Sequence, residues 1–172
     1  MNVFTDVKPD AYYYDAVLWA VSHGVTTGAT PTTFEPNTIC SQAHILTFMW
    51  RAAGKPAPTI ASPYSNKAVT SDQYFYQAFV WAWEKGLISN TALDPNAPCS
   101  RSDVVTYLWK LSGSPACSTT QFTDVPASAS YAQAVAWALE NQITTGATTT
   151  TFDPSAICTR GQIVTFLWRY FV

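Results

Sequence analysis

Apolar residues recur along the chain in two kinds of short block. The first kind contains Ala16, Trp19, Ala20 and His23. The last three follow Ala16 by three, four and seven positions, a spacing that places all four on one stripe of a helix. The second kind, residues 45–50, is apolar on almost every side and is interrupted mainly by Thr47. We therefore predict an amphipathic helix followed by a helix that is buried on most sides.

Both blocks occur three times. Cys40, Cys99 and Cys158 recur at an interval of 59 residues, and a tryptophan follows each of them ten positions later. A fixed interval of this length marks a repeat of one structural unit. The first block returns at residues 76–82 and 132–138, and the middle copy diverges because its loop is three residues shorter.

Each copy is predicted to form a helix, a loop and a second helix. The hydroxyl residues Ser41, Ser100 and Thr159 are favourable N-caps for the second helices, and Thr159 with Gln162 makes a capping box. Because the second helices are too apolar to stand alone, we predict an all-α fold. Its three tandem helix–loop–helix repeats take a pseudo-threefold arrangement around a central three-helix bundle. Clusters of Gly and Pro divide this single module, residues 1–172, into repeats 1–56, 57–116 and 117–172.

Composition narrows the classes of partner. Hydrophobic residues make up 48% of the chain and charged residues only 12%, about half the usual share, which is typical of extracellular and carbohydrate-facing surfaces. A net charge of −2 provides no basic field, so we expect no nucleic-acid partner. No apolar run of about 18 residues is present, so we expect no membrane insertion. The chain shows no signal peptide, and an exported protein would have lost it or carried it upstream.

The cysteines and histidines do not form a recognisable reactive site. We predict that the three equivalent cysteines are small buried hydrophobes, with a disulfide involving Cys117 or a metal site as alternatives. Cys40 and His44 are four residues apart, yet the other two copies have an acid and an amide at the histidine position, so we predict no metal and no cofactor. Neither His23 nor His44 stands beside a nucleophile, and no catalytic motif is present, so we predict a non-enzymatic protein.

Each copy also carries short motifs in a fixed order. They are the opening Phe4-Thr5-Asp6-Val7, a helix rich in aromatics and alanine, loop glycines, a Phe-x-Pro turn and the segment Cys-Thr-Arg-Gly-Gln that starts at Cys158. This order resembles the S-layer homology domain over essentially the whole chain. The resemblance implies a pseudo-trimeric helical module whose inter-repeat grooves bind secondary cell-wall polysaccharide, commonly bearing pyruvylated N-acetylmannosamine.

The resemblance also implies a set of ligand-binding residues, which map onto Arg101, Arg160, Gln42, Ser100, Thr159, Gly28, Gly146, Asp6 and Asp124. A guanidinium offers a pyruvate carboxylate two hydrogen bonds, and a helix N-terminus adds backbone N–H donors. Copy one has Gln42 in place of the arginine and His44 in place of the family glutamate. The middle copy has Asn66 for the aspartate and Asn90 for the loop glycine. We therefore expect fewer than three working grooves.

Plainer roles remain open for several of these residues. The arginines can be solvated residues of a first helical turn, and the aspartates can cap the turn into the first helix. We predict that Trp50, Trp109 and Trp168 pack into the core and that Tyr12, Tyr13 and Tyr74 are exposed.

The function we expect is non-covalent anchoring of a bacterial surface protein to cell-wall polysaccharide, an acidic or pyruvylated glycan. The chain would then lie outside the cell, at the surface or in the wall, and would anchor an upstream domain. The alternative is a protein–protein assembly or host-contact module that retains the fold and has lost glycan binding. A hydrolase is a third hypothesis, and no sequence motif favours it.

Overall fold

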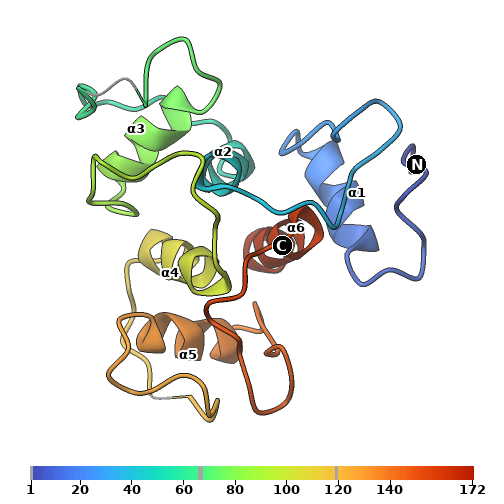
Figure 1. Cartoon of the computed structure of the whole chain (residues 1–172), viewed down its shortest axis with the longest axis vertical. Coiled ribbons are helices and arrows are strands. Elements are labelled where there is room, and N and C mark those ends of the chain that lie inside the picture. Colours follow the sequence, from blue (N-terminus) through green and yellow to red (C-terminus); the bar gives the residue numbers. More distant parts are fainter. Residues whose placement is uncertain (1, 66–67, 119) are drawn as a thin grey trace.

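The computed structural model describes residues 2–65, 68–118 and 120–172. Six helices lie in these ranges: α1 (Tyr14–Ser22), α2 (Gln42–Ala52), α3 (Tyr76–Glu84), α4 (Arg101–Leu111), α5 (Ala132–Glu140) and α6 (Arg160–Phe171). The described residues form no β-strand, and the predicted all-α fold is confirmed (Figure 1). Asn66, the expected counterpart of Asp6 in the middle copy, lies outside the described residues.

The helices pair across the boundaries of the sequence repeats. Helix α3 packs on α2, α5 packs on α4, and α1 closes the ring by packing on α6. The second helices α2, α4 and α6 gather at the centre, as predicted, and the first helices lie outside them (Figure 1). The first helix of each repeat therefore covers the second helix of the preceding repeat, so that no repeat buries its own apolar faces alone.

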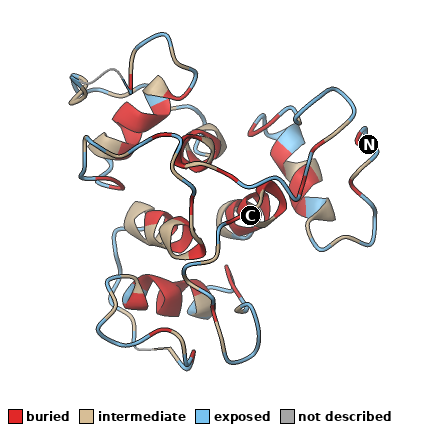
Figure 2. Cartoon of the chain, viewed as in Figure 1, coloured by how far each residue is buried: buried red, intermediate tan, exposed pale blue. Residues whose placement is uncertain are grey.

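Burial follows this arrangement (Figure 2). The central helices bury most of their surface, and Ile45, Leu46 and Met49 of α2 are fully buried, as are their counterparts in α4 and α6. Each such side chain contributes about 1.5–3 kcal/mol to stability. Helix α1 buries one face only, and because it ends at Ser22, the residue His23 is exposed. The prediction that His23 belongs to the buried stripe is wrong.

A ring of backbone hydrogen bonds joins the three repeats just before the central helices. The N–H of Cys40 donates to the carbonyl of Cys158 at 2.9 Å, Cys158 donates to Cys99 at 2.8 Å, and Cys99 donates to Cys40 at 3.0 Å. These three side chains are buried, which confirms the prediction of small hydrophobes. All four thiols are free, including that of Cys117, and the disulfide alternative is not seen. Burial raises the pKa of Cys40 to about 11 and that of Cys158 to about 12.

The N-termini of the central helices have their donors occupied. Ser41, Ser100 and Thr159 are N-caps, as predicted, and all three form capping boxes, where only the box of Thr159 with Gln162 was predicted. The next two amides of each helix donate to loop carbonyls of the following repeat; in α6 they reach Thr38 and Pro36 of repeat one at 2.9 Å. These bonds satisfy N–H groups that a helix start leaves unpaired. The expectation that these amides serve a ligand is therefore wrong.

Two of the tryptophans near the ends of the central helices form hydrogen bonds with the linkers that follow. Trp50 and Trp109 are half-buried and pack against the core, and their indole N–H groups donate to the carbonyls of Pro56 and Pro115 at 2.9 Å. The predicted core packing is thus confirmed in part, because one edge of each ring reaches the surface. Of the predicted exposed tyrosines, Tyr12 and Tyr74 are 62% and 57% exposed, and Tyr13 is half-buried.

Candidate functional site

The first residue of α4, Arg101, inserts its side chain into the third repeat. Its Nε donates to the carbonyl of Phe152 at 2.8 Å, and its Cζ lies 4.8 Å from the Phe152 ring and 5.5 Å from the Phe166 ring. The residue is 8% exposed. A solvated arginine is therefore the wrong description, because Arg101 is held between two aromatic faces at the seam between two repeats.

Arg160, at the start of α6, repeats this arrangement against the first repeat. Its Nε donates to the carbonyl of Phe34 at 2.8 Å, and its Cζ lies 4.8 Å and 5.5 Å from the rings of Phe34 and Phe48. The inner nitrogen Nη2 is buried without a hydrogen-bond partner. In the described part of the chain, no carboxylate forms an ion pair with Arg160 or Arg101. Burial lowers the pKa of both guanidiniums, which nevertheless stay charged at neutral pH.

Asp6 and Asp124 stabilise the loops that contact the two arginines. The carboxylate of Asp6 accepts from the N–H groups of Phe34 and Glu35 at 2.9 and 2.7 Å, and Asp124 accepts from Phe152 and Asp153 at the same distances. Each aspartate thus fixes the turn whose carbonyl and ring hold an arginine. The prediction that these residues cap the turn into the first helix is wrong, because their partners lie 28 and 29 residues away in the loop before the second helix.

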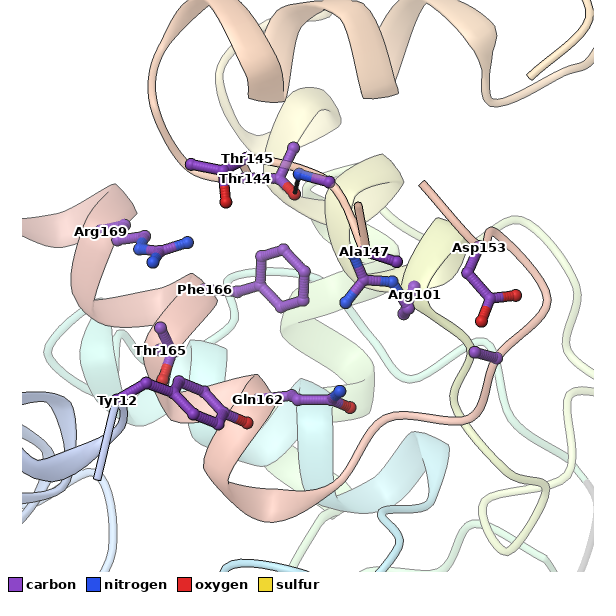
Figure 3. A pocket seen from close by; sticks show the side chains of 12 residues that line it. Tyr12, Arg101, Thr144, Thr145, Ala147, Asp153, Gln162, Thr165, Phe166 and Arg169 are labelled. Carbon is purple, nitrogen blue, oxygen red and sulfur yellow. Dashed lines mark hydrogen bonds between the residues drawn. The ribbon is translucent and has the colours of Figure 1, made fainter. Parts of the chain in front are cut away.

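A pocket of about 480 Å³ opens beside Arg101. Its walls come from the loop of repeat three, from α6 and from the segment before α1, and they consist of Tyr12, Arg101, Thr144, Thr145, Gly146, Ala147, Asp153, Ala156, Gln162, Thr165, Phe166 and Arg169. In Figure 3, Arg101 and Arg169 lie on opposite sides of the Phe166 ring, and Tyr12 and Gln162 lie below it. Pockets of roughly 300–1,000 Å³ hold small organic ligands. Two guanidiniums against one carboxylate make this pocket suited to an anion.

Gly146 lines this pocket and Gly28 occupies the same place in repeat one. Both have positive φ, 93° and 98°. A Cβ on Gly146 would lie 2.7 Å from the ring of Phe122 and would clash with the carbonyl of Thr148, and the Phe4 ring blocks Gly28 in the same way. The glycines therefore serve the close packing of the loop, and Gly146 also leaves room in the pocket.

The third seam, at Gln42, is closed by internal hydrogen bonds. The amide nitrogen of Gln42 donates to Asp103 at 3.0 Å and to the carbonyl of Pro98 at 3.3 Å, and its oxygen accepts from the hydroxyl of Tyr107 at 2.6 Å. Gln42 is 4% exposed. Because its amide is fully engaged and a carboxylate stands beside it, Gln42 offers an anion neither a free donor nor a positive charge. Lys110, the counterpart of Arg169, remains as a cation at this seam and donates to the carbonyl of Leu87 at 3.3 Å.

The structure thus divides the nine predicted ligand-binding residues into groups. Arg101 and Gly146 line one pocket. The side-chain oxygens of Ser100 and Thr159 instead accept backbone hydrogen bonds as helix N-caps. The other residues that line the pocket were not predicted to bind a ligand. They include Tyr12, whose exposure alone was predicted, Gln162, which was predicted only as part of a capping box, and Arg169. A sequence signal for Arg169 existed, because a basic residue follows the tryptophan in every copy.

Among the described residues, no group of three or more His, Cys, Asp or Glu side chains is placed to hold a metal ion. No helix there has the length and apolar character needed to cross a membrane.

Comparison with known proteins points to one family. The profile of the S-layer homology domain matches residues 3–45 and 121–164, together just over half of the chain. The matched segments fall in the first and third copies. The Surface-layer 125 kDa protein of Lysinibacillus sphaericus is 34% identical over 105 residues, an alignment that covers 58% of this chain and 9% of that protein. The chain therefore corresponds to a small part of that relative's length.

Proposed function

Because the chain belongs to the S-layer homology domain family, we propose that it anchors a bacterial surface protein to the cell wall without a covalent bond. The ligand is an acidic secondary cell-wall polysaccharide, which binds at the seams of Arg101 and Arg160. The middle copy, which the family profile does not match, is in this proposal a third and divergent repeat of the same module.

The observation that carries the proposal is the state of the two arginines. Each guanidinium is withdrawn from water, and no carboxylate of the described residues forms an ion pair with it. Asp124 and Asp153 act on Arg101, and Asp6 and Glu35 on Arg160, only from beyond ion-pair distance. Desolvating a charge without pairing it closely costs several kcal/mol. Arg101 borders a pocket lined by a second guanidinium. An incoming carboxylate would supply the missing counter-charge, and charge-assisted hydrogen bonds of this kind are about twice as strong as neutral ones.

A pyruvylated sugar fits this chemistry. A pyruvate ketal holds a carboxylate rigidly on the sugar ring, so little conformational freedom is lost when it binds. Tyr12, which is exposed at the pocket, offers an aromatic face to the sugar. With Gln42 engaged internally, we propose two binding sites per chain, which would give avidity for a repeating polymer.

Sedimentation with purified cell-wall sacculi tests the proposal. The wild-type chain should pellet with intact sacculi and remain in solution when the secondary polymer has been extracted. The chain with both Arg101→Met and Arg160→Met should remain in solution in either case, and Lys85→Met, which removes an exposed cation away from both seams, should behave as wild type. Equal retention of all variants on both preparations would refute the proposal.

A second candidate function is a protein–protein assembly or host-contact module. The closed seam at Gln42 supports it, since one of the three equivalent seams lacks an arginine and is filled by the protein itself. This candidate predicts that extraction of the secondary polymer leaves retention unchanged and that a protein component of the wall is needed instead. Two titratable glycan sites would count against it.

A further inference from the structure

The third residue of each central helix differs among the three seams, and its type correlates with whether the seam contains an arginine. This position holds His44 in α2, Asp103 in α4 and Gln162 in α6, and each side chain accepts a hydrogen bond from the N–H of its N-cap. Gln162 lines the Arg101 pocket. The acid occurs only at the seam that lacks an arginine, so the two seams with arginines carry a side chain that still has a donor to offer.

The capping box decides which nitrogen of His44 carries the proton. The N–H of Ser41 lies 3.1 Å from Nδ1 of His44. A backbone amide can only donate, so Nδ1 of the neutral ring must accept and the proton must be on Nε2. The Oε1 atom of Gln162 accepts from Thr159 at 3.0 Å in the same way, which leaves its NH₂ group as the donor.

The repeat geometry places His44 at the Arg160 seam as Gln162 is placed at the Arg101 pocket. The two arginines have matching distances to their carbonyl and ring partners, and both capping boxes are complete. In Figure 3, Gln162 lies below the Phe166 ring and Arg101, among the residues that line the pocket. His44 is half-buried, and the charge of Arg160 acts on it directly.

We propose that His44 is a ligand-binding residue of the Arg160 seam, where its Nε2–H donates to the acidic sugar, and that binding there takes up a proton. Gln162 donates in the Arg101 pocket without any change in protonation. The two seams therefore bind the same glycan with different pH dependence. This inference rests on the proposed function, because it needs an anion at the seam.

The direction of the linkage follows from the charges around the seam. Burial, and then the charge of Arg160, lower the pKa of His44 in the free protein. The other charged or titratable groups printed at this seam are Arg51 on α2, Cys40 before α2, Tyr74 before α3, Glu35 in the loop and Asp6 in the segment before α1. They act on Arg160 or on one another. A bound carboxylate favours the imidazolium and so raises the pKa of His44. The protonated ring keeps a partner, since Nδ1–H can donate to the Ser41 hydroxyl at 3.1 Å.

The experiment uses the whole chain with Arg101→Met, so that only the Arg160 seam reports, titrated with pyruvylated N-acetylmannosamine. Calorimetry at pH 8 and at pH 5.5 should give an affinity roughly three- to tenfold higher at the lower pH. Buffers of different ionisation enthalpy should reveal proton uptake. In NMR spectra the ligand should raise the pKa of His44, while His23, exposed at the end of α1, serves as the internal reference. Neutral N-acetylmannosamine should leave the pKa of His44 unchanged.

The substitution His44→Gln is the matched control, because it gives the Arg160 seam the residue of its sister pocket. It should keep the cap, as Gln162 does in α6, and it should abolish both the proton uptake and the pH dependence of the binding. Binding by the Arg101→Met chain that is independent of pH, with an unmoved His44 pKa, would overturn the inference and leave the proposed function intact. Absence of binding by the wild-type chain would overturn both.

Discussion

Replacing Arg160 with methionine should separate the contribution of this residue to function from its contribution to stability. The substitution removes the hydrogen bond to the Phe34 carbonyl, of about 1.5–3 kcal/mol, and the contacts of the charge with two rings, of about 0.5–2 kcal/mol each. It also removes the cost of burying a guanidinium that is 8% exposed, has an unpartnered Nη2 and has no carboxylate partner among the described residues, a cost of several kcal/mol. Methionine retains the packing of the side-chain stem against the rings.

These opposing effects nearly cancel. We expect Arg160→Met to change the free energy of unfolding by no more than about 1 kcal/mol, measured by urea denaturation followed through tryptophan fluorescence. As a comparison, Leu167→Ala on the same helix deletes a fully buried side chain and should cost about 2–5 kcal/mol.

Glycan binding, unlike stability, should change strongly. Loss of a buried charge-assisted contact costs about 2–5 kcal/mol, so glycan affinity at the Arg160 seam should fall at least about 30-fold. If Arg160→Met lost more than about 3 kcal/mol of stability while the affinity at this seam stayed unchanged, the arginine would be a structural residue and the reasoning would be refuted.

Three further predictions concern stability and reactivity. Stability should fall as the pH drops from about 6.5 to about 5, because the unfolded chain then binds a proton that the lowered pKa of His44 excludes from the folded chain. Urea denaturation should show a smaller fall over this range in His44→Gln than in the wild type. Iodoacetamide should label one thiol of the folded protein, that of the half-buried Cys117, and all four thiols after denaturation, as counted by mass spectrometry. Thermal unfolding should show that Gly146→Ala costs about 2 kcal/mol more than Gly113→Ala, since both have positive φ but only the first Cβ meets neighbouring atoms.

The period and the apolar patterning were sufficient to predict the architecture. The interval between the cysteines and the all-round apolar character of residues 45–50 predicted three buried helices around a common centre, and the N-caps followed from the hydroxyl residues. The pairing of α1 with α6 was not visible, because a periodic sequence does not state whether a helix packs within its own copy or on the next one.

The candidate site was predicted in part for a related reason. The motif located Arg101 and Arg160, but the ring pairs that hold them come from a different repeat, so their burial depended on contacts across a seam. The aspartates were predicted to act locally, whereas their partners lie in a distant loop. The closure of the Gln42 seam depends on Tyr107, whose hydroxyl stands where the other copies have phenylalanine. That difference is visible in the sequence, but the partner of the hydroxyl lies in another repeat.

Counting the binding sites by calorimetry with pyruvylated N-acetylmannosamine tests the central claim most directly. The account expects two sites in the wild-type chain, one after either Arg101→Met or Arg160→Met, and none after both substitutions. Three sites in wild type, or an unchanged number in the double variant, would contradict it.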